Sequence, residues 1–174
     1  MKPEKLADLK KELSQRSVPE LTELCLRMVK YKKENKELLN YLLYDASDPL
    51  AYAEKVKIFL EDDFKNLQKH YYYSTKSLRK ILRLLNKYAK YTLSSEVELE
   101  LLLWFCRNFL EYTDPKTSHK PLQSLLIRQL LKIKSLIPKL HEDLQFDYQQ
   151  ELEQLLQKAA DKLRWWHQYP SALT

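Results

Sequence analysis

Apolar residues recur at intervals of three and four along almost the whole chain, and this spacing is typical of amphipathic α-helices. The first such run predicts a helix from about Glu4 to Gln15. No segment shows the strict alternation of a half-buried strand. The pattern therefore predicts a protein built from helices.

The second helix has a clear start signal. Ser17 can accept a hydrogen bond from the first turn, and Glu20 can reach back to the Ser17 amide. The apolar period then continues to Tyr44 through a very polar stretch. We expect one continuous helix here, and a break near Asn35 is the alternative.

Five further helices are predicted from the same spacing and from caps and prolines. Asp48-Pro49 and Ser95–Glu98 are start signals, and we expect Ser74 or Thr75 to cap the helix between them. The five expected ranges are about 49–69, 75–91, 95–112, 121–136 and 145–167. The segment 97–110 is apolar nearly all round, so we expect that helix to be the most buried.

These elements define the expected fold class, which is all-α with about seven helices. Short connections favour antiparallel neighbours in a single compact bundle or a short helical-hairpin stack. A chain of 174 residues has the usual length of one domain, so we expect a single helical domain over residues 1–174. The helix starts are unevenly spaced, which argues against a repeat architecture.

The composition excludes several kinds of site, because the chain contains no glycine. Phosphate-cradling loops and serine nucleophile elbows need glycine. The two cysteines, Cys25 and Cys106, lie in apolar periodic segments and are expected in the core. We therefore expect no enzyme activity.

Metal and cofactor sites are not expected either. The four histidines are scattered and lack the paired spacing of metal ligands. The one alternative is a meeting of His70, His119 and His141 at one end of the bundle. The longest apolar run, Leu101–Cys106, is too short to span a membrane, and the first residues do not resemble a signal peptide, so we expect a cytoplasmic protein that does not enter membranes.

Charge is segregated along the chain. The net charge is +6, yet residues 64–95 contain eight Lys and Arg and no acid, and residues 115–141 contain six and no acid. The remainder carries −8, so the protein is dipolar rather than uniformly basic.

Six cations of the first window fall on one face of its helix, in a row about 21 Å long. They are Lys76, Arg79, Lys80, Arg83, Lys87 and Lys90. Like charges at this spacing oppose helix formation, so something must offset their repulsion. Solvent or acids elsewhere in the chain, such as Glu96, Glu100, Glu111, Glu151 and Asp161, are one possibility. A bound polyanion is the other.

Aromatic residues cluster near the basic row and near the chain end. Tyr71–Tyr73 begin the basic segment, and Arg164–His167 contain two tryptophans. We expect both groups to pack as lids over the core, with base stacking as the alternative.

Several segments together resemble a family of small, uncharacterised, all-helical bacterial proteins. They are Glu20-Leu21, Leu24–Arg27, Lys32–Leu39, Tyr41–Tyr44, Leu78–Arg83, Glu96–Leu99 and Leu140–Tyr148. The resemblance implies a bacterial cytoplasmic protein, and it lends no activity, ligand or catalytic residue.

The sequence thus predicts a protein that acts through surface contacts. The leading interpretation is a non-enzymatic protein-interaction or scaffold module that binds a protein partner or a second copy. The alternative is binding of nucleic acid or another polyanion through the Lys76–Lys90 face.

Overall fold

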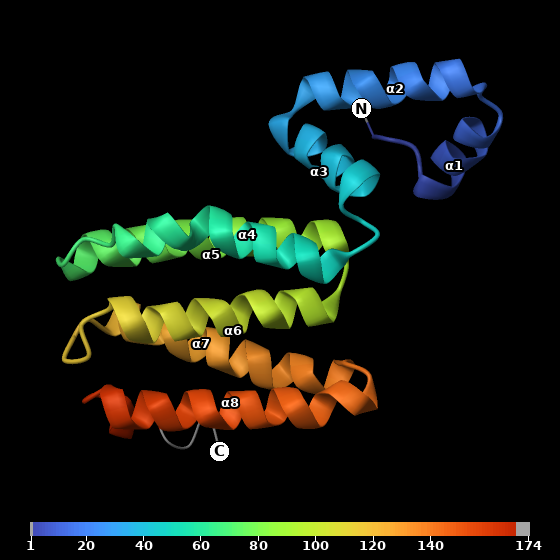
Figure 1. Ribbon diagram of the computed structural model, residues 1–174. Helices are drawn as coiled ribbons and strands as arrows, with labels where there is room; N and C mark the ends of the chain where they lie inside the picture. Colours follow the sequence, from blue (N-terminus) through green and yellow to red (C-terminus); the bar gives the residue numbers. More distant parts are fainter. Residues whose placement is uncertain (1, 170–174) are drawn as a thin grey trace. The chain divides into compact units, whose positions relative to one another are not determined.

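The computed structural model describes residues 2–169 (Figure 1). Residue contacts divide the chain into two compact units, Met1–Ala46 and Ser47–Thr174. Each unit is described by itself below, and the expected single domain stays a prediction. The part of the chain that is described contains eight α-helices and two short 3-10 turns, which confirms the all-α fold class.

Unit 1 contains α1 (Leu6–Ser14), α2 (Val18–Tyr31) and α3 (Lys33–Tyr44). The Ser17 amide donates to a Glu20 carboxylate oxygen at 2.8 Å, so the expected start of α2 is confirmed. The continuous helix expected to reach Tyr44 is wrong. Lys32 is extended, with φ −142° and ψ 143°, and ends α2 there.

The break lets α2 and α3 pack against one another as a helical hairpin. The Asn35 side-chain amide donates to the carbonyl of Met28 at 2.8 Å and so satisfies an acceptor that the helix end leaves open. This break explains why the chain has one helix more than the pattern predicts.

Unit 2 contains the other five helices. They are α4 (Pro49–Lys65), α5 (Tyr71–Thr92), α6 (Ser95–Tyr112), α7 (Lys120–Leu136) and α8 (Glu142–Lys162). A 3-10 turn, Ile137–Lys139, links α7 to α8 at Pro138, and a second turn, Trp166–Gln168, follows α8. The last helix therefore ends sooner than expected, because Leu163 is extended.

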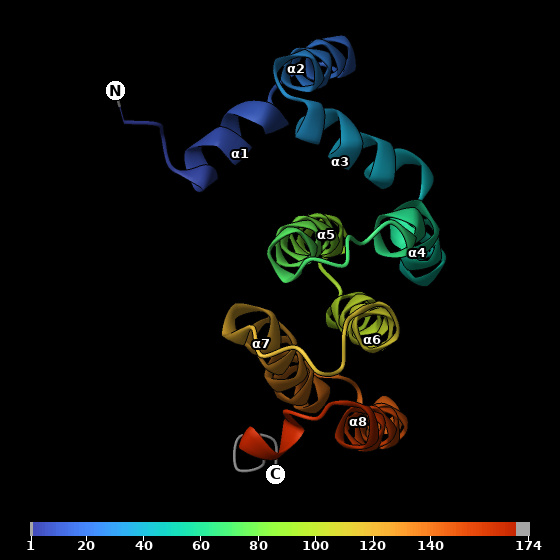
Figure 2. The same ribbon diagram turned by 90° about the vertical axis from the view of Figure 1, so that its left-hand side faces the viewer.

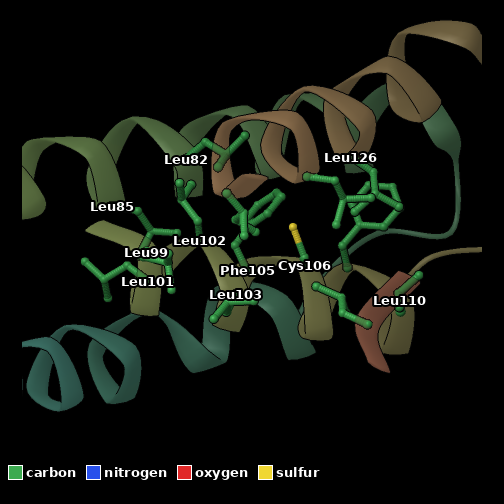
Figure 3. Close-up of a cluster of buried hydrophobic side chains, with 14 of the residues drawn as sticks. Leu82, Leu85, Leu99, Leu101, Leu102, Leu103, Phe105, Cys106, Leu110 and Leu126 are labelled. Atoms are coloured by element: carbon green, nitrogen blue, oxygen red, sulfur yellow. The ribbon is translucent and has the colours of Figure 1, made fainter. Parts of the chain in front are cut away.

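Helix α6 lies at the centre of unit 2 and packs against α4, α5, α7 and α8. It contributes more buried side chains than any other described helix, including Phe105 and Phe109, which are fully buried. Figure 3 shows leucines of α6 beside Leu82 and Leu85 of α5, with Leu126 of α7 in the same buried cluster. The expectation that segment 97–110 is the most buried helix is thus confirmed.

The two cysteines have different environments. Cys106 is completely buried in the core of α6, as expected, and burial raises the pKa of its thiol far above the ordinary range. Cys25 on α2 is exposed, so its expected place in the core is wrong. The described residues of α1 and α2 bury no side chain, which leaves their apolar stripes at the surface.

The caps of unit 2 agree with the sequence at α4 and differ at α5. Asp48 accepts from the Ala51 amide at 2.9 Å, as expected. Helix α5 begins at Tyr71, one turn before the expected Ser74 or Thr75 cap. Both hydroxyls instead donate to the Tyr71 carbonyl inside the helix, at 3.0 Å and 2.6 Å, because the chain enters α5 at His70.

Three connections meet at one end of unit 2. Figures 1 and 2 show that the α4–α5 loop, the α6–α7 loop and the segment after α8 share this end. The N-termini of α5 and α7 lie there as well. Residues from both acid-free windows of the sequence are therefore neighbours at this end.

Candidate polyanion-binding surface

The six cations expected to form a row all lie on α5, and we call them the basic face. Lys76, Arg79, Lys80, Arg83 and Lys90 are exposed, and Lys87 is half-buried. The apolar side chains of the same helix, such as Leu78 and Leu85, are buried. The pairing of one apolar and one basic stripe follows directly from the helical period of the sequence.

Few members of the basic face are neutralised by acids. Lys80 Nζ lies 3.2 Å from an oxygen of Asp63, and both side chains are substantially exposed. Lys87 lies over the ring of Tyr88, 4.4 Å from its centroid. The other four, Lys76, Arg79, Arg83 and Lys90, have no carboxylate within ion-pair distance among residues 2–169.

The acids that could have neutralised the basic face bind other residues. Glu100 accepts hydrogen bonds from Tyr148 at 2.9 Å and from Lys57 at 3.0 Å. Glu111 lies 3.5 Å from Lys162. Glu151 pairs with Arg107, Glu96 accepts a hydrogen bond from Tyr148, and Asp161 accepts one from Gln157. Among residues 2–169, Lys80 of the basic face pairs with Asp63, whereas Lys76, Arg79, Arg83 and Lys90 have no acidic partner.

A recess of about 560 Å³ runs along the first half of the basic face, and we call it the α5 recess. One wall is α5, with Lys76, Arg79 and Arg83. The opposite wall is the start of α7, with His119 and Pro121. Lys80 also lines it and is paired with Asp63, but no carboxylate among residues 2–169 lines the recess itself, so cations dominate its electrostatic field.

The loop of residues 113–119, between α6 and α7, is held in place by hydrogen bonds. The buried Gln123 donates to the Thr117 carbonyl at 2.8 Å and accepts from the Tyr169 hydroxyl at 3.2 Å. The Arg164 amide donates to the Pro115 carbonyl at 3.1 Å. These bonds attach the segment after α8 to the loop and fix the loop before ligand arrives.

Two further recesses continue from the α5 recess across this end of unit 2. The first, of about 870 Å³, shares His119 with it and also contains Lys69, Lys116 and Lys120. The second, of about 270 Å³, shares Lys116 and Lys120 and adds Arg164. We call the three together the basic track.

Only two carboxylates line the basic track, Glu111 and Asp114. Glu111 is paired with Lys162, and Asp114 accepts from the Lys116 amide at 2.9 Å. The track therefore keeps a strong excess of positive charge along its length.

Aromatic rings border the track where it passes between the recesses. Tyr71 lies between two imidazoles, with ring centroids 4.4 Å from His70 and 4.5 Å from His119. Tyr71, Tyr72 and Tyr73 are each about half exposed, at 50%, 60% and 50%. The expectation that these tyrosines form a lid over the core is therefore wrong, because α5 starts early and turns the rings outward.

The other expected aromatic lid is confirmed, because Trp165 is buried and Trp166 packs against the core. Two of the three histidines considered as a metal site, His70 and His119, each contact the ring of Tyr71, on which they pack from either side. The third, His141, instead lies 3.2 Å from Asp143. Within residues 2–169 no three His, Cys, Asp or Glu side chains gather closely enough to hold a metal, and the expectation of no metal or cofactor stays a prediction.

Sequence reasoning found the basic face but missed the other half of the track. Lys116, Lys120 and His119 belong to the second acid-free window, whose excess of cations was the available signal. Arg164 had no such signal, because only the fold brings the end of α8 to the 113–119 loop.

Comparison with protein-family models, curated proteins and solved structures finds no match to this chain. The resemblance to a bacterial family stays a prediction. No helix in the part of the chain that the structure describes is long and apolar enough to cross a membrane.

Proposed function

We propose that this protein binds an anionic polymer through the basic face of α5. The observation that carries the proposal is that Lys76, Arg79, Arg83 and Lys90 are exposed and have no acidic partner among the described residues. A row of like charges on one helix face destabilises that helix. An anionic ligand would remove the repulsion that the fold leaves in place.

The position of the row also supports binding. A surface recess with cations on one wall and no carboxylate concentrates anions and raises their association rate. Four of the six members are lysines, which act as point charges rather than as bidentate ligands. This composition fits recognition of a repeating charge better than recognition of one phosphate group.

Under this proposal the protein acts by binding and not by catalysis, and it acts in a bacterial cytoplasm. No carboxylate or thiol among residues 2–169 lines the α5 recess, and its imidazole, His119, packs on the ring of Tyr71. The bacterial part of the proposal follows from the sequence resemblance alone, and the cytoplasmic part is also predicted by the sequence on other grounds.

Retention on immobilised heparin tests the proposal. We expect the wild-type protein to be retained and the variant R79Q/K80Q/R83Q to elute at much lower salt. Gln keeps helix propensity, so the variant should remain folded. The matched control K30Q/K139Q/K158Q removes the same charge from exposed lysines elsewhere. Equal elution of the variant and the control would contradict the proposal.

A second candidate is the protein-interaction role, and one feature of unit 1 favours it. Leu9, Leu13 and Leu24 line a recess of about 550 Å³ between α1 and α2, whose helices bury no side chain. Exposed apolar groups of this kind are typical of protein interfaces. If a second copy binds there, light scattering should show a dimer that L13E and L24E abolish. A monomer at all accessible concentrations would contradict self-association.

A further inference from the structure

The geometry points to single-stranded nucleic acid as the polymer that the basic track binds. This inference rests on the proposed function and names the ligand class of the same surface. Its basis is the combination, along one recessed path, of half-exposed aromatic rings and cations, most of which have no acidic partner among residues 2–169. Proteins that bind single strands combine these two elements, with cations that follow the backbone and rings that stack on unpaired bases.

Tyr72 has the position that such a stacking platform needs. It lines the α5 recess together with Lys76 and Arg79, which follow it by four and seven residues. Residues at this spacing share one face of a helix, so the ring stands at the head of the cation row. At 60% exposure, most of its surface is open to a ligand.

The shape of the surface argues against a duplex. A helix that reads duplex DNA projects into the major groove. The first half of the basic face instead lines a recess whose other wall is His119 and Pro121 of α7. A paired duplex keeps its bases stacked inside, where Tyr72 could not reach them. A single strand can enter the recess and turn a base onto the ring.

The path is longer than the α5 recess alone. Beyond His119 the track continues past Lys116 and Lys120 to Arg164. The 113–119 loop that presents Lys116 is fixed by the bonds from Gln123 and Arg164. A strand that leaves the α5 recess at His119 therefore meets further cations that are already in place.

Fluorescence anisotropy with labelled dT oligonucleotides tests the inference. We expect a dT strand of about 20 nucleotides to bind at least tenfold more tightly than a duplex of equal length. Tyr72→Leu should weaken binding of the strand about tenfold and leave binding of heparin unchanged. The control Tyr31→Leu removes an exposed tyrosine of α2 and should change neither.

The length of the path is tested with a second pair of variants. We expect affinity to rise as the strand is lengthened from about 6 to about 20 nucleotides. K116Q/R164Q should lose most of that gain, whereas K139Q/K158Q should keep it. If the affinity of both variants rose equally with strand length, the path across the 113–119 loop would be contradicted.

Failure of the inference and failure of the proposed function give different results. If duplex and strand bind equally and Tyr72→Leu has no effect, the ligand class is wrong while polyanion binding stands. Binding to vesicles of anionic lipid with none to oligonucleotides would also overturn the ligand class alone. If the wild-type protein bound none of these ligands, heparin included, both the inference and the proposed function would be overturned.

Discussion

The ring of His119 lies 4.5 Å from the ring of Tyr71, centroid to centroid. Tyr71 is the first residue of α5, and His119 immediately precedes α7. This contact brings the starts of the two acid-free segments of the chain together. It also places an imidazole on the wall opposite Arg79 in the α5 recess.

Removing this imidazole should affect binding more than stability. His119 makes no side-chain cap bond to α7, and an aromatic pair contributes only about 1 kcal/mol. We expect His119→Ala to unfold within about 1 kcal/mol of wild type and to bind anionic polymer several-fold more weakly. The control His141→Ala removes an exposed imidazole outside the track. Denaturant melts and anisotropy measure the two effects, and a large loss of stability without loss of affinity would contradict the assignment.

The centre of α6 should dominate the stability of unit 2. Phe105 is completely buried, so we expect Phe105→Ala to lower the free energy of unfolding by about 3–5 kcal/mol. Trp104 is only partly buried, with its ring edge-on to Phe64 at 5.2 Å, and Trp104→Ala should have a smaller effect. Urea denaturation compares the two. A larger effect at Trp104 would show that the core is centred elsewhere on α6.

A polar network joins α4, α6 and α8 at Glu100. Its carboxylate accepts from Lys57 and from Tyr148, and both donors are largely buried. Loss of the acceptor leaves Lys57 with Glu54 alone and Tyr148 with only a longer bond to Glu96, so we expect Glu100→Ala to lower the free energy of unfolding by about 2 kcal/mol. Glu151→Ala, which breaks the more exposed pair with Arg107, should have an effect below about 1 kcal/mol. Similar effects in the two variants would contradict the importance of this network.

Alkaline pH should destabilise unit 2. Burial and the nearby Glu100 charge raise the pKa of Tyr148 far above its ordinary value, and burial does the same for the Cys106 thiol. Burial lowers the pKa of Lys57, but its bonds to Glu54 and Glu100 outweigh this and raise it overall. All three groups therefore hold their protons in the folded state after the unfolded chain has released them.

Since the folded state then binds more protons, the free energy of unfolding falls as pH rises. The decline should begin near pH ~8.5 with the thiol and steepen above pH ~10 with the phenol and the ammonium group. Tyr148→Phe should reduce the slope above pH ~10 and leave the earlier decline unchanged. Denaturant melts from neutral to alkaline pH measure this, and a slope unaltered by Tyr148→Phe would contradict it.

Much of the fold was predictable because helical period and capping are local properties. Asp48 and Glu20 cap the helices that the sequence assigned to them, and the face of α5 follows from residue spacing alone. The break at Lys32 corresponds to the alternative of a break near Asn35, which the sequence did not favour because no Gly or Pro marks it. The packing of α2 on α3 is a tertiary contact that stabilises the break. The exposure of Cys25 was missed for a related reason, since period identifies an apolar stripe but not whether anything covers it.

About half of the candidate site could be predicted from the sequence. The six charges of the basic face could be placed on one side of α5. That four of them, Lys76, Arg79, Arg83 and Lys90, have no acidic partner among residues 2–169 depends on tertiary structure. Glu100 and Glu111 were reasonable partners by sequence, yet the packing of α4 and α8 assigns them to Lys57 and Lys162. The meeting of the two basic segments at His119 is likewise a long-range contact that no local pattern encodes.

The salt dependence of affinity for a dT oligonucleotide tests the central claim, that the exposed cations of α5 bind the phosphates of a single strand. If about four to six phosphates are neutralised, log K should fall with log salt at a slope of about −3 to −4. R79Q/K80Q/R83Q should lower the steepness of that slope by about 2. A slope near zero for wild type, or the same slope for wild type and variant, would contradict the claim.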